Sequence, residues 1–222
     1  MKTVQENKSK LFSVRYLFYD FVKLTAAVPG LLWFRLKTIY VSKTAKRKIR
    51  GGALLISNHV GFSDPVVLQL CVWYRRHHFI CIKQLFEGRF TRLLFTGFLC
   101  IPIDRENFSM NSFREITQRL QDGELVTMFP EGHVNGVSEG IAAFKSGMVL
   151  MAVKSGRPIV PVFIERRKHW YNRVRMAIGE PLETAALLGK RPTMTQIEEI
   201  TQMLYQKEEE LKTICNLQEE SV

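Results

Sequence analysis

The sequence predicts an α/β fold with a largely parallel central sheet flanked by helices. After residue 50, short apolar runs alternate with longer segments of helical periodicity, which is typical of β-α-β units. The chain has 222 residues, 46% of them hydrophobic, which is enough for the core of one large domain. We therefore expect an α/β domain over residues 46–222, preceded by a distinct segment over residues 1–45.

The expected strands are short runs of β-branched and other apolar residues. The first run, from Ala53 to Ser57, carries no charge and is expected to be buried on both faces of the sheet. In the run over 158–164, Pro161 lacks a backbone donor, which favours a bend or an edge position. With these two runs, strands are expected at 53–57, 78–83, 98–103, 125–129, 158–164 and 174–179.

The segments between these strands carry helix signals. A helix is expected to begin at Pro65, because proline is favoured in the first turn. Over 112–123, Ser112 and Glu115 have the spacing of a capping box, and Gly123 marks the end. Apolar spacing predicts another helix within 143–156. A polar, acidic helix from about 195 to 217 is expected to cover an edge or side of the core.

Two adjacent histidines, His77 and His78, come directly before the second expected strand. Consecutive residues do not share a face, and neither an HExxH nor a CxxC motif accompanies them. We expect a surface turn at these residues rather than a metal site.

The first 45 residues are rich in basic and aromatic side chains. Residues 1–50 hold twelve Lys or Arg and two acids, a net charge of +10, whereas residues 51–222 hold twenty and nineteen. Charged residues and Pro29 interrupt the apolar run too often for a simple membrane-spanning helix. The pattern predicts two amphipathic helices, bent near Pro29 and Gly30, that lie on a membrane surface with anionic lipids. The alternative is a helical hairpin packed on the protein's own core.

Charge and cysteine usage narrow the cellular setting. The near-neutral body of the chain argues against a nucleic-acid partner. The four cysteines form no CxxC pair and no secretory signal precedes them, which favours reduced thiols. We expect a membrane-associated protein on the cytoplasmic side.

The most informative residues for function are His59 and Asp64, which follow the first expected strand. Imidazole has a usual pKa of about 6.5, so it can accept a proton near pH 7, and a carboxylate fixes its tautomer. Reactive groups of open α/β sheets gather beyond the carboxyl ends of strands. The pair therefore favours a catalytic base. In the alternative, His59 caps a turn and Asp64 opens the following helix.

Two further strand ends carry charged residues. Arg105 follows the third expected strand, and Glu131 and Gly132 follow the fourth. Taken alone, Arg105 is also compatible with a surface ion pair to Asp104 or Glu106, and Glu131 with a helix cap or a solvated position. The absence of a GxSxG motif and of a cysteine in an activated setting disfavours a covalent nucleophile.

Four ordered blocks, "NHVGFSD", "GFLCIPIDR", "FPEGH" and "IVPV", resemble those of the glycerolipid acyltransferase family, which makes phosphatidic acid from lysophosphatidic acid. The resemblance covers roughly residues 10 to 185. It implies that His59 takes the proton of an acceptor hydroxyl while Asp64 orients the ring, and that the alkoxide attacks a thioester carbonyl. It also implies that Arg105 holds the acceptor's phosphate and that Glu131 shapes the acceptor site.

The same resemblance extends to three more residues. Gly132 lets the third-block loop turn closely, and Lys145 matches a lysine that often follows this block and is implied to contact the phosphate. The alternative for Lys145 is a solvated lysine on a helix. Asn58, in the first block, is expected to contact the substrate. The third block departs from the family pattern, because His133 stands where a threonine or an arginine pair is usual. This departure leaves the acceptor headgroup open.

The resemblance implies an O-acyltransferase that moves an acyl chain from acyl-CoA or acyl carrier protein to a lysophospholipid, most closely 1-acylglycerol 3-phosphate. One alternative is another lysolipid or lipid hydroxyl as acceptor, and another is a non-catalytic protein that binds anionic lipids. No cofactor or metal is implied. Backbone amides near the start of the helix after His59 are expected to stabilise the oxyanion.

Overall fold

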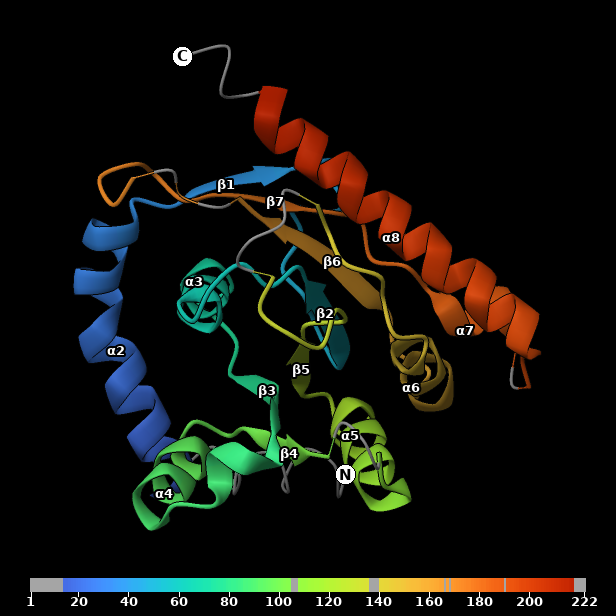
Figure 1. Ribbon diagram of the computed structural model, residues 1–222, viewed down its shortest axis with the longest axis horizontal. Coiled ribbons are helices and arrows are strands. Elements are labelled where there is room, and N and C mark those ends of the chain that lie inside the picture. The colour runs from blue at the N-terminus through green and yellow to red at the C-terminus, as the bar shows by residue number, and fades with distance from the viewer. Residues whose placement is uncertain are drawn as a thin grey trace.

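A sheet of seven strands forms the centre of the computed structural model, which describes residues 14–104, 108–135, 140–165, 167, 169–189 and 191–217 (Figure 1). In spatial order the strands are β1 (Lys37–Tyr40), β7 (Arg175–Ile178), β6 (Ile159–Ile164), β2 (Ala53–Ser57), β5 (Leu125–Met128), β3 (His77–Ile82) and β4 (Ile101–Ile103). The strands from β6 to β4 are parallel, while β7 is antiparallel to β6 and β1 is parallel to β7. The predicted α/β fold with a largely parallel sheet is confirmed.

Helices cover both faces of this sheet (Figure 1). One face carries α5 (Met110–Gln121), α6 (Gly147–Ser155) and α8 (Met194–Leu217), with the short α7 (Thr184–Leu188) beside α6. The other face carries α3 (Asp64–Cys71), and α2 (Val14–Phe34) runs outside α3. The 3-10 turn η1 (Lys83–Phe86) and α4 (Arg89–Gly97) lie next to β3 and β4.

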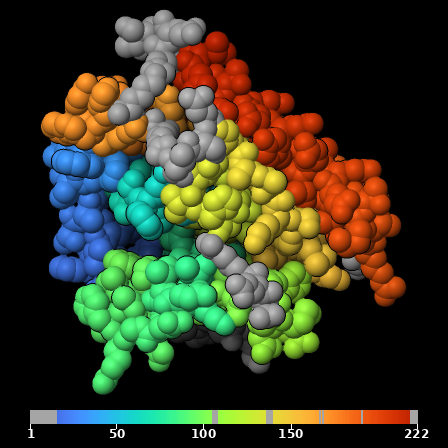
Figure 2. Space-filling view, viewed as in Figure 1, coloured from blue at the N-terminus to red at the C-terminus, as the bar shows by residue number. Residues whose placement is uncertain are grey.

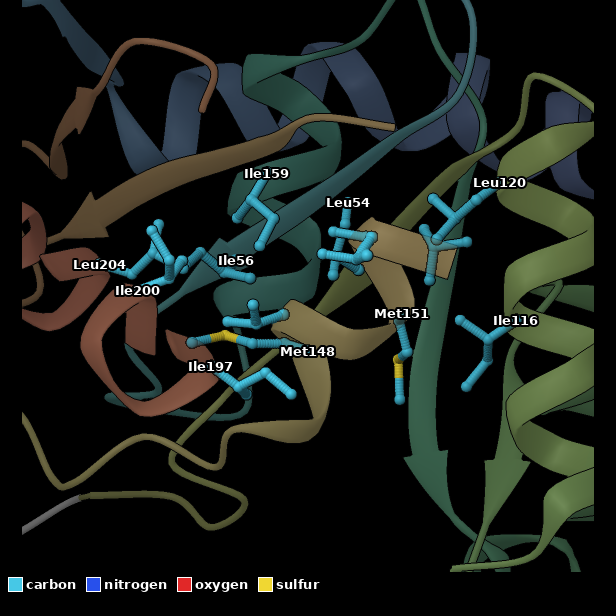
Figure 3. Packing of buried hydrophobic residues seen from close by; sticks show 14 of the residues in the cluster. Leu54, Ile56, Ile116, Leu120, Met148, Met151, Ile159, Ile197, Ile200 and Leu204 are labelled. Atoms are coloured by element: carbon cyan, nitrogen blue, oxygen red, sulfur yellow. The ribbon is translucent and has the colours of Figure 1, made fainter. Parts of the chain in front are cut away.

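The central strand β2 is buried along its whole length, as its uncharged sequence predicts. Leu54 and Ile56 belong to the hydrophobic cluster under α5, α6 and α8, which Figure 3 shows from close by. Ala53 and Leu55 belong to the cluster on the opposite face, under α3. A strand covered by helices on both sides requires a continuous apolar run. Burial of β2 on both faces fixes the position of its carboxyl end, which His59 follows.

Three local expectations were wrong. Lys37–Tyr40 form a strand inside the segment for which helices were predicted, because they pair with β7. Pro161 lies in a central strand rather than at an edge or a bend. Its carbonyl accepts from Gly179 N at 2.9 Å, just beyond the end of β7, so the ladder ends where proline lacks a donor. The capping box expected at Ser112 and Glu115 is also wrong: α5 is capped by Ser109, whose Oγ accepts from Ser112 N at 3.1 Å.

The two adjacent histidines are buried in β3, which corrects the prediction of a surface turn. The ring of His77 is fully buried, stacks on Phe79 and lies 2.8 Å from Thr127 Oγ1 through Nδ1. His78 Nε2 lies 3.2 Å from Glu124 Oε2. Tertiary partners from β5 and from the turn before it make these polar residues compatible with burial. Burial lowers the pKa of His77 from its usual 6.5 to about 3.

We expect His77 to make the fold less stable in acid. Its folded pKa lies below its unfolded pKa, so the unfolded chain binds the extra proton and stability falls as the pH drops from 6.5 toward 3. Each pH unit in this window costs up to about 1.4 kcal/mol. The His77→Gln variant should therefore have a flatter curve of unfolding free energy against pH in urea denaturation. His169→Gln, at an exposed histidine, is the control and should follow the wild type; equal slopes for all three would contradict the assignment.

Among the described residues of the amino-terminal segment, one helix, α2, spans Val14–Phe34, whereas two helices bent near Pro29 were predicted. Pro29 lies inside α2 without ending it. One side of α2 packs on the domain: Tyr19 is 5% exposed and its hydroxyl accepts from His77 N at 2.9 Å, and Asp20 pairs with Arg76. Among the described residues, one helix is long and apolar enough to cross a membrane, the window Tyr16–Phe34 of α2.

Candidate active site

His59 and Asp64 form a hydrogen-bonded pair just beyond the carboxyl end of β2. The distance from His59 Nδ1 to Asp64 Oδ2 is 2.8 Å. The Asp64 side chain is 2% exposed and the His59 side chain 15%, so the carboxylate is shielded while the ring keeps an accessible edge. Because the carboxylate accepts from Nδ1–H, the other ring nitrogen, Nε2, is the one left to accept a proton. This is the arrangement of a general base and its orienting acid.

The chain between the two residues folds around the carboxylate. The amides of Val60 and Gly61 donate to Asp64 Oδ2 at 2.8 and 2.9 Å, the same oxygen that His59 contacts. Asp64 is also the first residue of α3, and the N-cap residue Ser63 makes no side-chain capping bond. The alternative of a helix-opening aspartate is therefore compatible with the catalytic interpretation. The same short loop closes the histidine pair and begins the helix.

Phe129 holds the ring of His59 from one side. It follows β5, the neighbour of β2, and its ring stacks on the imidazole with centroids 3.9 Å apart and planes at 12°. This contact restricts rotation of the imidazole about its side-chain bonds. Phe129 was not predicted as a site residue, although it stands in the "FPEGH" block at the end of an expected strand.

Glu131 connects the loops that follow β2 and β5. Its Oε1 accepts from His59 N at 3.0 Å and its Oε2 accepts from Ala142 N at 3.0 Å. The side chain is 4% exposed, so the carboxylate is engaged by protein backbone on both oxygens. Two further bonds close the same loop: Asn135 N donates to His59 O at 2.7 Å, and His133 Nδ1 lies 3.0 Å from Glu131 O. Glu131 thus fixes the backbone of His59.

A cavity of about 780 Å³ opens beside His59. Gly132 and Lys145 contribute to its lining, and the polar backbone turn at Gly132 has φ of +75°, which favours glycine. A side chain there would approach the Lys145 ammonium, since a Cβ would lie 3.4 Å from Nζ. Most of the lining is apolar and comes from β3, β5, η1, α4 and α6, including Phe79, Ile80, Ile82, Leu85, Phe95, Met128, Met148 and Met151.

Of the two cationic residues predicted to contact the phosphate, Lys145 is among the described residues and Arg105 is not. Lys145 is exposed at the cavity, and among the described residues no carboxylate pairs with its ammonium. Arg105 lies outside the described residues, and its chain neighbour Asp104 lines the cavity. Lys145 and the chain position next to Arg105 are therefore brought to the same cavity as His59.

Asn58 has a different set of partners from the substrate contact that was predicted. Its Nδ2 donates to Ile164 O at 2.9 Å and its Oδ1 accepts from Ile164 N at 2.7 Å. The side chain is 4% exposed and is not part of the cavity lining. Asn58 therefore extends the pairing of β2 with β6 by one side-chain rung, directly before His59.

A third buried carboxyl group lies behind the site. Glu208 on α8 is fully buried, and neither oxygen has a hydrogen-bond partner among the described residues. Burial, followed by repulsion from Glu131 and Glu209, raises its pKa well above the usual value, which favours the neutral acid. The burial of Glu208 could not be predicted from the sequence, because it stands in an acidic helix and charged residues on such helices are usually solvated.

The described residues include no group of three or more His, Cys, Asp or Glu side chains that could hold a metal ion. The site offers an oriented imidazole, a shielded carboxylate and a largely apolar cavity that Lys145 also lines. Such a site can remove a proton from a hydroxyl held at its mouth.

Comparison with known proteins agrees with this chemistry. The family model named Acyltransferase matches residues 38–165. The chain is 26% identical over 166 residues to the 1-acyl-sn-glycerol-3-phosphate acyltransferase of Bacillus subtilis, covering 72% of this chain and 81% of that protein. It is 32% identical over 113 residues to the enzyme of that name from Haemophilus influenzae, covering 50% of this chain and 46% of that protein.

The fold also has a solved counterpart. The crystal structure of the 1-acyl-sn-glycerophosphate (LPA) acyltransferase PlsC from Thermotoga maritima superimposes with a TM-score of 0.61 at 19% identity. The match covers 89% of this chain and 80% of that chain. The similarity therefore includes nearly the whole α/β domain rather than a fragment of it.

Proposed function

The chain belongs to the acyltransferase family, and from this we propose that it transfers an acyl chain from a thioester to the free hydroxyl of 1-acylglycerol 3-phosphate, giving phosphatidic acid. The relatives named above carry this activity in their names. The observation that carries the proposal is the His59–Asp64 pair, with its Nδ1 to Oδ2 distance of 2.8 Å, at the mouth of an apolar cavity. No cofactor takes part in this reaction.

In the proposed mechanism His59 acts as general base. Its Nε2 takes the proton of the acceptor hydroxyl, while Asp64 accepts a hydrogen bond from Nδ1–H and stabilises the imidazolium. The alkoxide attacks the thioester carbonyl and forms a tetrahedral intermediate. When the carbon–sulfur bond breaks, the thiolate leaves and the imidazolium returns its proton to it. No acyl-enzyme forms.

Hydrogen bonds in the loop after His59 limit which backbone amides can stabilise the oxyanion. The amides of Val60 and Gly61 are already bound to Asp64, so they are not free to stabilise the intermediate. The next amides, of Phe62 and Ser63, have no hydrogen-bond partner among the described residues and stand at the N-terminus of α3. We assign the oxyanion to these two amides, where the helix dipole also favours negative charge.

The two parts of the acceptor site differ in chemistry. Lys145 at the cavity, together with Arg105 next to Asp104, suits the phosphate, since lysine and arginine both form charge-assisted hydrogen bonds with phosphate oxygens. Gly132 leaves space for the Lys145 ammonium. Asn58 and Glu131 position the site from behind rather than contact the lipid. The apolar lining suits an acyl chain, and its volume is within the range of ligand pockets.

A panel of substrates tests the proposal. Palmitoyl-CoA and palmitoyl acyl carrier protein are each supplied with lysophosphatidic acid or with monoacylglycerol, which differ only in the phosphate, and thioester consumption is measured. We expect product only when the phosphate is present. Equal rates with monoacylglycerol would refute phosphate recognition, and no consumption with any pair would refute the reaction. The donor that reacts identifies the thioester.

A second acceptor class is favoured by one observation. His133, at the start of the loop after Glu131, lies where the family usually has a threonine or an arginine pair, and its Nδ1 lies 3.0 Å from Glu131 O. An imidazole supplies no permanent charge for a phosphate. Lysophosphatidylethanolamine and lysophosphatidylglycerol therefore belong in the same panel, and a faster rate with either would transfer the assignment to that headgroup.

We also propose that α2 places the enzyme on the cytoplasmic surface of an anionic membrane. Within the described part of the predicted segment 1–45, α2 is the membrane-associating part, since Lys37–Tyr40 belong to the sheet. Its outer side exposes large apolar residues at helical spacing, including Phe21 at 65%, Leu24 at 68% and Leu32 at 74%. Basic residues in this part of the chain complement anionic headgroups. The acceptor and product are lipids, which makes such docking useful.

The Leu24→Glu/Leu32→Glu variant should bind anionic vesicles about tenfold more weakly than the wild type, because it places two charges on the apolar side of α2. Cosedimentation with vesicles of phosphatidylglycerol and phosphatidylcholine measures the loss. Met203→Glu is the matched control, since Met203 is 39% exposed on α8, across the sheet from α2. Unchanged sedimentation of the double variant would contradict the anchor.

A further inference from the structure

The loop between β6 and β7 packs on the carboxyl-terminal end of α2 and displays aromatic rings there. Trp33 of α2 and Trp170 of the loop stack with centroids 6.0 Å apart, and Tyr171 meets Trp170 edge to face. The three residues are 58%, 71% and 56% exposed. Figure 2 shows the loop, in orange, directly above the upper end of the blue helix. We call Trp33, Arg167, Trp170 and Tyr171 the aromatic patch.

One arginine holds the two segments of the patch together. Arg167 Nη2 donates to Trp33 O at 2.6 Å and Nη1 donates to Trp170 O at 2.9 Å. Its guanidinium also lies 5.0 Å from the centroid of the Phe34 ring. Arg35 Nη1 donates to Tyr171 O at 3.3 Å. These contacts order the backbone beneath the rings and leave the rings themselves facing outward.

Packing within the chain does not account for the exposed rings. A loop that only supported the fold would turn its largest apolar side chains inward, since burial of a large aromatic side chain stabilises the folded chain. Trp and Tyr beside arginine are instead the composition of protein segments at the boundary between lipid headgroups and acyl chains. Leu31 and Leu32, which are 48% and 74% exposed, continue the patch along the outer side of α2.

The loop that carries Trp170 and Tyr171 is linked to His59 through hydrogen bonds at the start of the loop. The loop begins after Ile164, whose backbone forms both hydrogen bonds with the Asn58 side chain, and Asn58 directly precedes His59. The base of the loop is closed by Glu165, which pairs with Arg175 and whose amide donates to Arg175 O at 2.9 Å. The loop with Trp170 and Tyr171 follows β6, and the loop with His59 follows β2. Because β6 and β2 are adjoining parallel strands, both loops lie at the carboxyl end of the sheet.

We propose that the aromatic patch is a second membrane contact, which inserts Trp170 and Tyr171 into the headgroup boundary of an anionic bilayer and so sets the orientation of His59 toward it. The proposal rests on the proposed function, because it assumes an acceptor in the membrane. Charge complementarity commits the patch to an anionic lipid surface: Arg35 and Arg173 are exposed beside the rings.

The three tryptophans of the chain permit a direct test. Trp73 follows α3 at the opposite edge of the sheet, two residues before Arg75, which donates to Gly51 O and Gly123 O just ahead of β2 and β5. The variant Trp33→Phe/Trp73→Phe leaves Trp170 as reporter, and Trp33→Phe/Trp170→Phe leaves Trp73. With anionic vesicles of acyl-chain-brominated lipids, we expect strong quenching for Trp170 and little for Trp73. Equal quenching of the two, or none for Trp170, would overturn the proposal.

A pair of functional variants separates this inference from the proposed reaction. Trp170→Ala/Tyr171→Ala should lower vesicle binding about tenfold and lower turnover of lysolipid in vesicles, with unchanged turnover of a short-chain, monomeric lysolipid. Trp73→Ala, which removes an equally large side chain that is 64% exposed, should change none of these. If the wild type consumes no thioester in either format, the proposed function fails; if it is active but the patch variant binds vesicles normally, this inference fails.

A second copy of the chain is the competing occupant of the patch. Light scattering of the wild type and of Trp170→Ala/Tyr171→Ala distinguishes self-association from lipid binding. A wild-type dimer that the variant loses, with vesicle binding unchanged, would assign the patch to self-association and overturn the membrane assignment. An unchanged mass with weaker vesicle binding supports the lipid contact.

Discussion

Replacing His59 by alanine is expected to lower the rate of acyl transfer by about 10²- to 10⁴-fold, the usual contribution of a general base. The imidazole is the group whose Nε2 faces away from Asp64 and can accept the hydroxyl proton, and it lines the cavity. Fold stability should change little, because the His59 side chain makes a single hydrogen bond and is partly exposed. The measurement is release of free thiol from the acyl thioester, with lysophosphatidic acid in excess.

The Asp64→Asn variant tests the orientation of the His59 ring without removing the ring. An asparagine amide can donate to Nδ1, which would place the ring proton on Nε2 and remove the base. We expect a loss of activity approaching that of His59→Ala, although the ring remains. His169→Ala, at an exposed histidine outside the cavity lining, is the control for removal of a histidine and should keep most of the activity. A fully active His59→Ala enzyme would exclude the assigned base.

Replacing Glu131 by glutamine is expected to be the next most damaging change. The carboxylate accepts from His59 N and Ala142 N, whereas an amide offers one oxygen and turns an NH₂ group toward the other donor. One buried amide is left unsatisfied, which costs about 1–3 kcal/mol in stability. The backbone of His59 then shifts, and a displacement of about 1 Å can lower the rate on the order of 100-fold.

This prediction requires two measurements on the same variant. The turnover number should fall more than the acceptor KM rises, because Glu131 positions the base and does not line the cavity. Chemical denaturation should show the stability loss. Glu180→Gln, an exposed glutamate after β7, is the matched control and should alter neither quantity. A pure rise in KM with unchanged kcat and stability would instead make Glu131 a substrate contact.

Several elements could be predicted because their signals are local. The uncharged run Ala53–Ser57 is a fully buried strand, and the segment predicted as the last helix forms α8. The five-residue spacing of His59 and Asp64 closes a hydrogen-bonded pair of 2.8 Å within one loop, so it too was predictable. By contrast, His77 looked like a turn residue, because its partner Thr127 is 50 positions away in the chain.

The site residues divide in the same way. The sequence indicated Gly132 and Lys145, and both line the cavity. It did not indicate Phe129, and it assigned to Asn58 a substrate contact where the structure has a bond to Ile164, 106 positions away. Which side chain meets which backbone depends on strand order and register. No pattern within a single segment contains that information.

The sequence by itself determined the alternation of strands and helices, the acyltransferase blocks at the strand ends and the His59–Asp64 pair, because periodicity and short-range spacing specify each of them. Only the tertiary structure decided how these parts are held: Phe129 on the imidazole, Glu131 on the backbone of His59, and the loop after β6 on the end of α2. These contacts exist because the order β6-β2-β5 brings distant loops to one edge of the sheet.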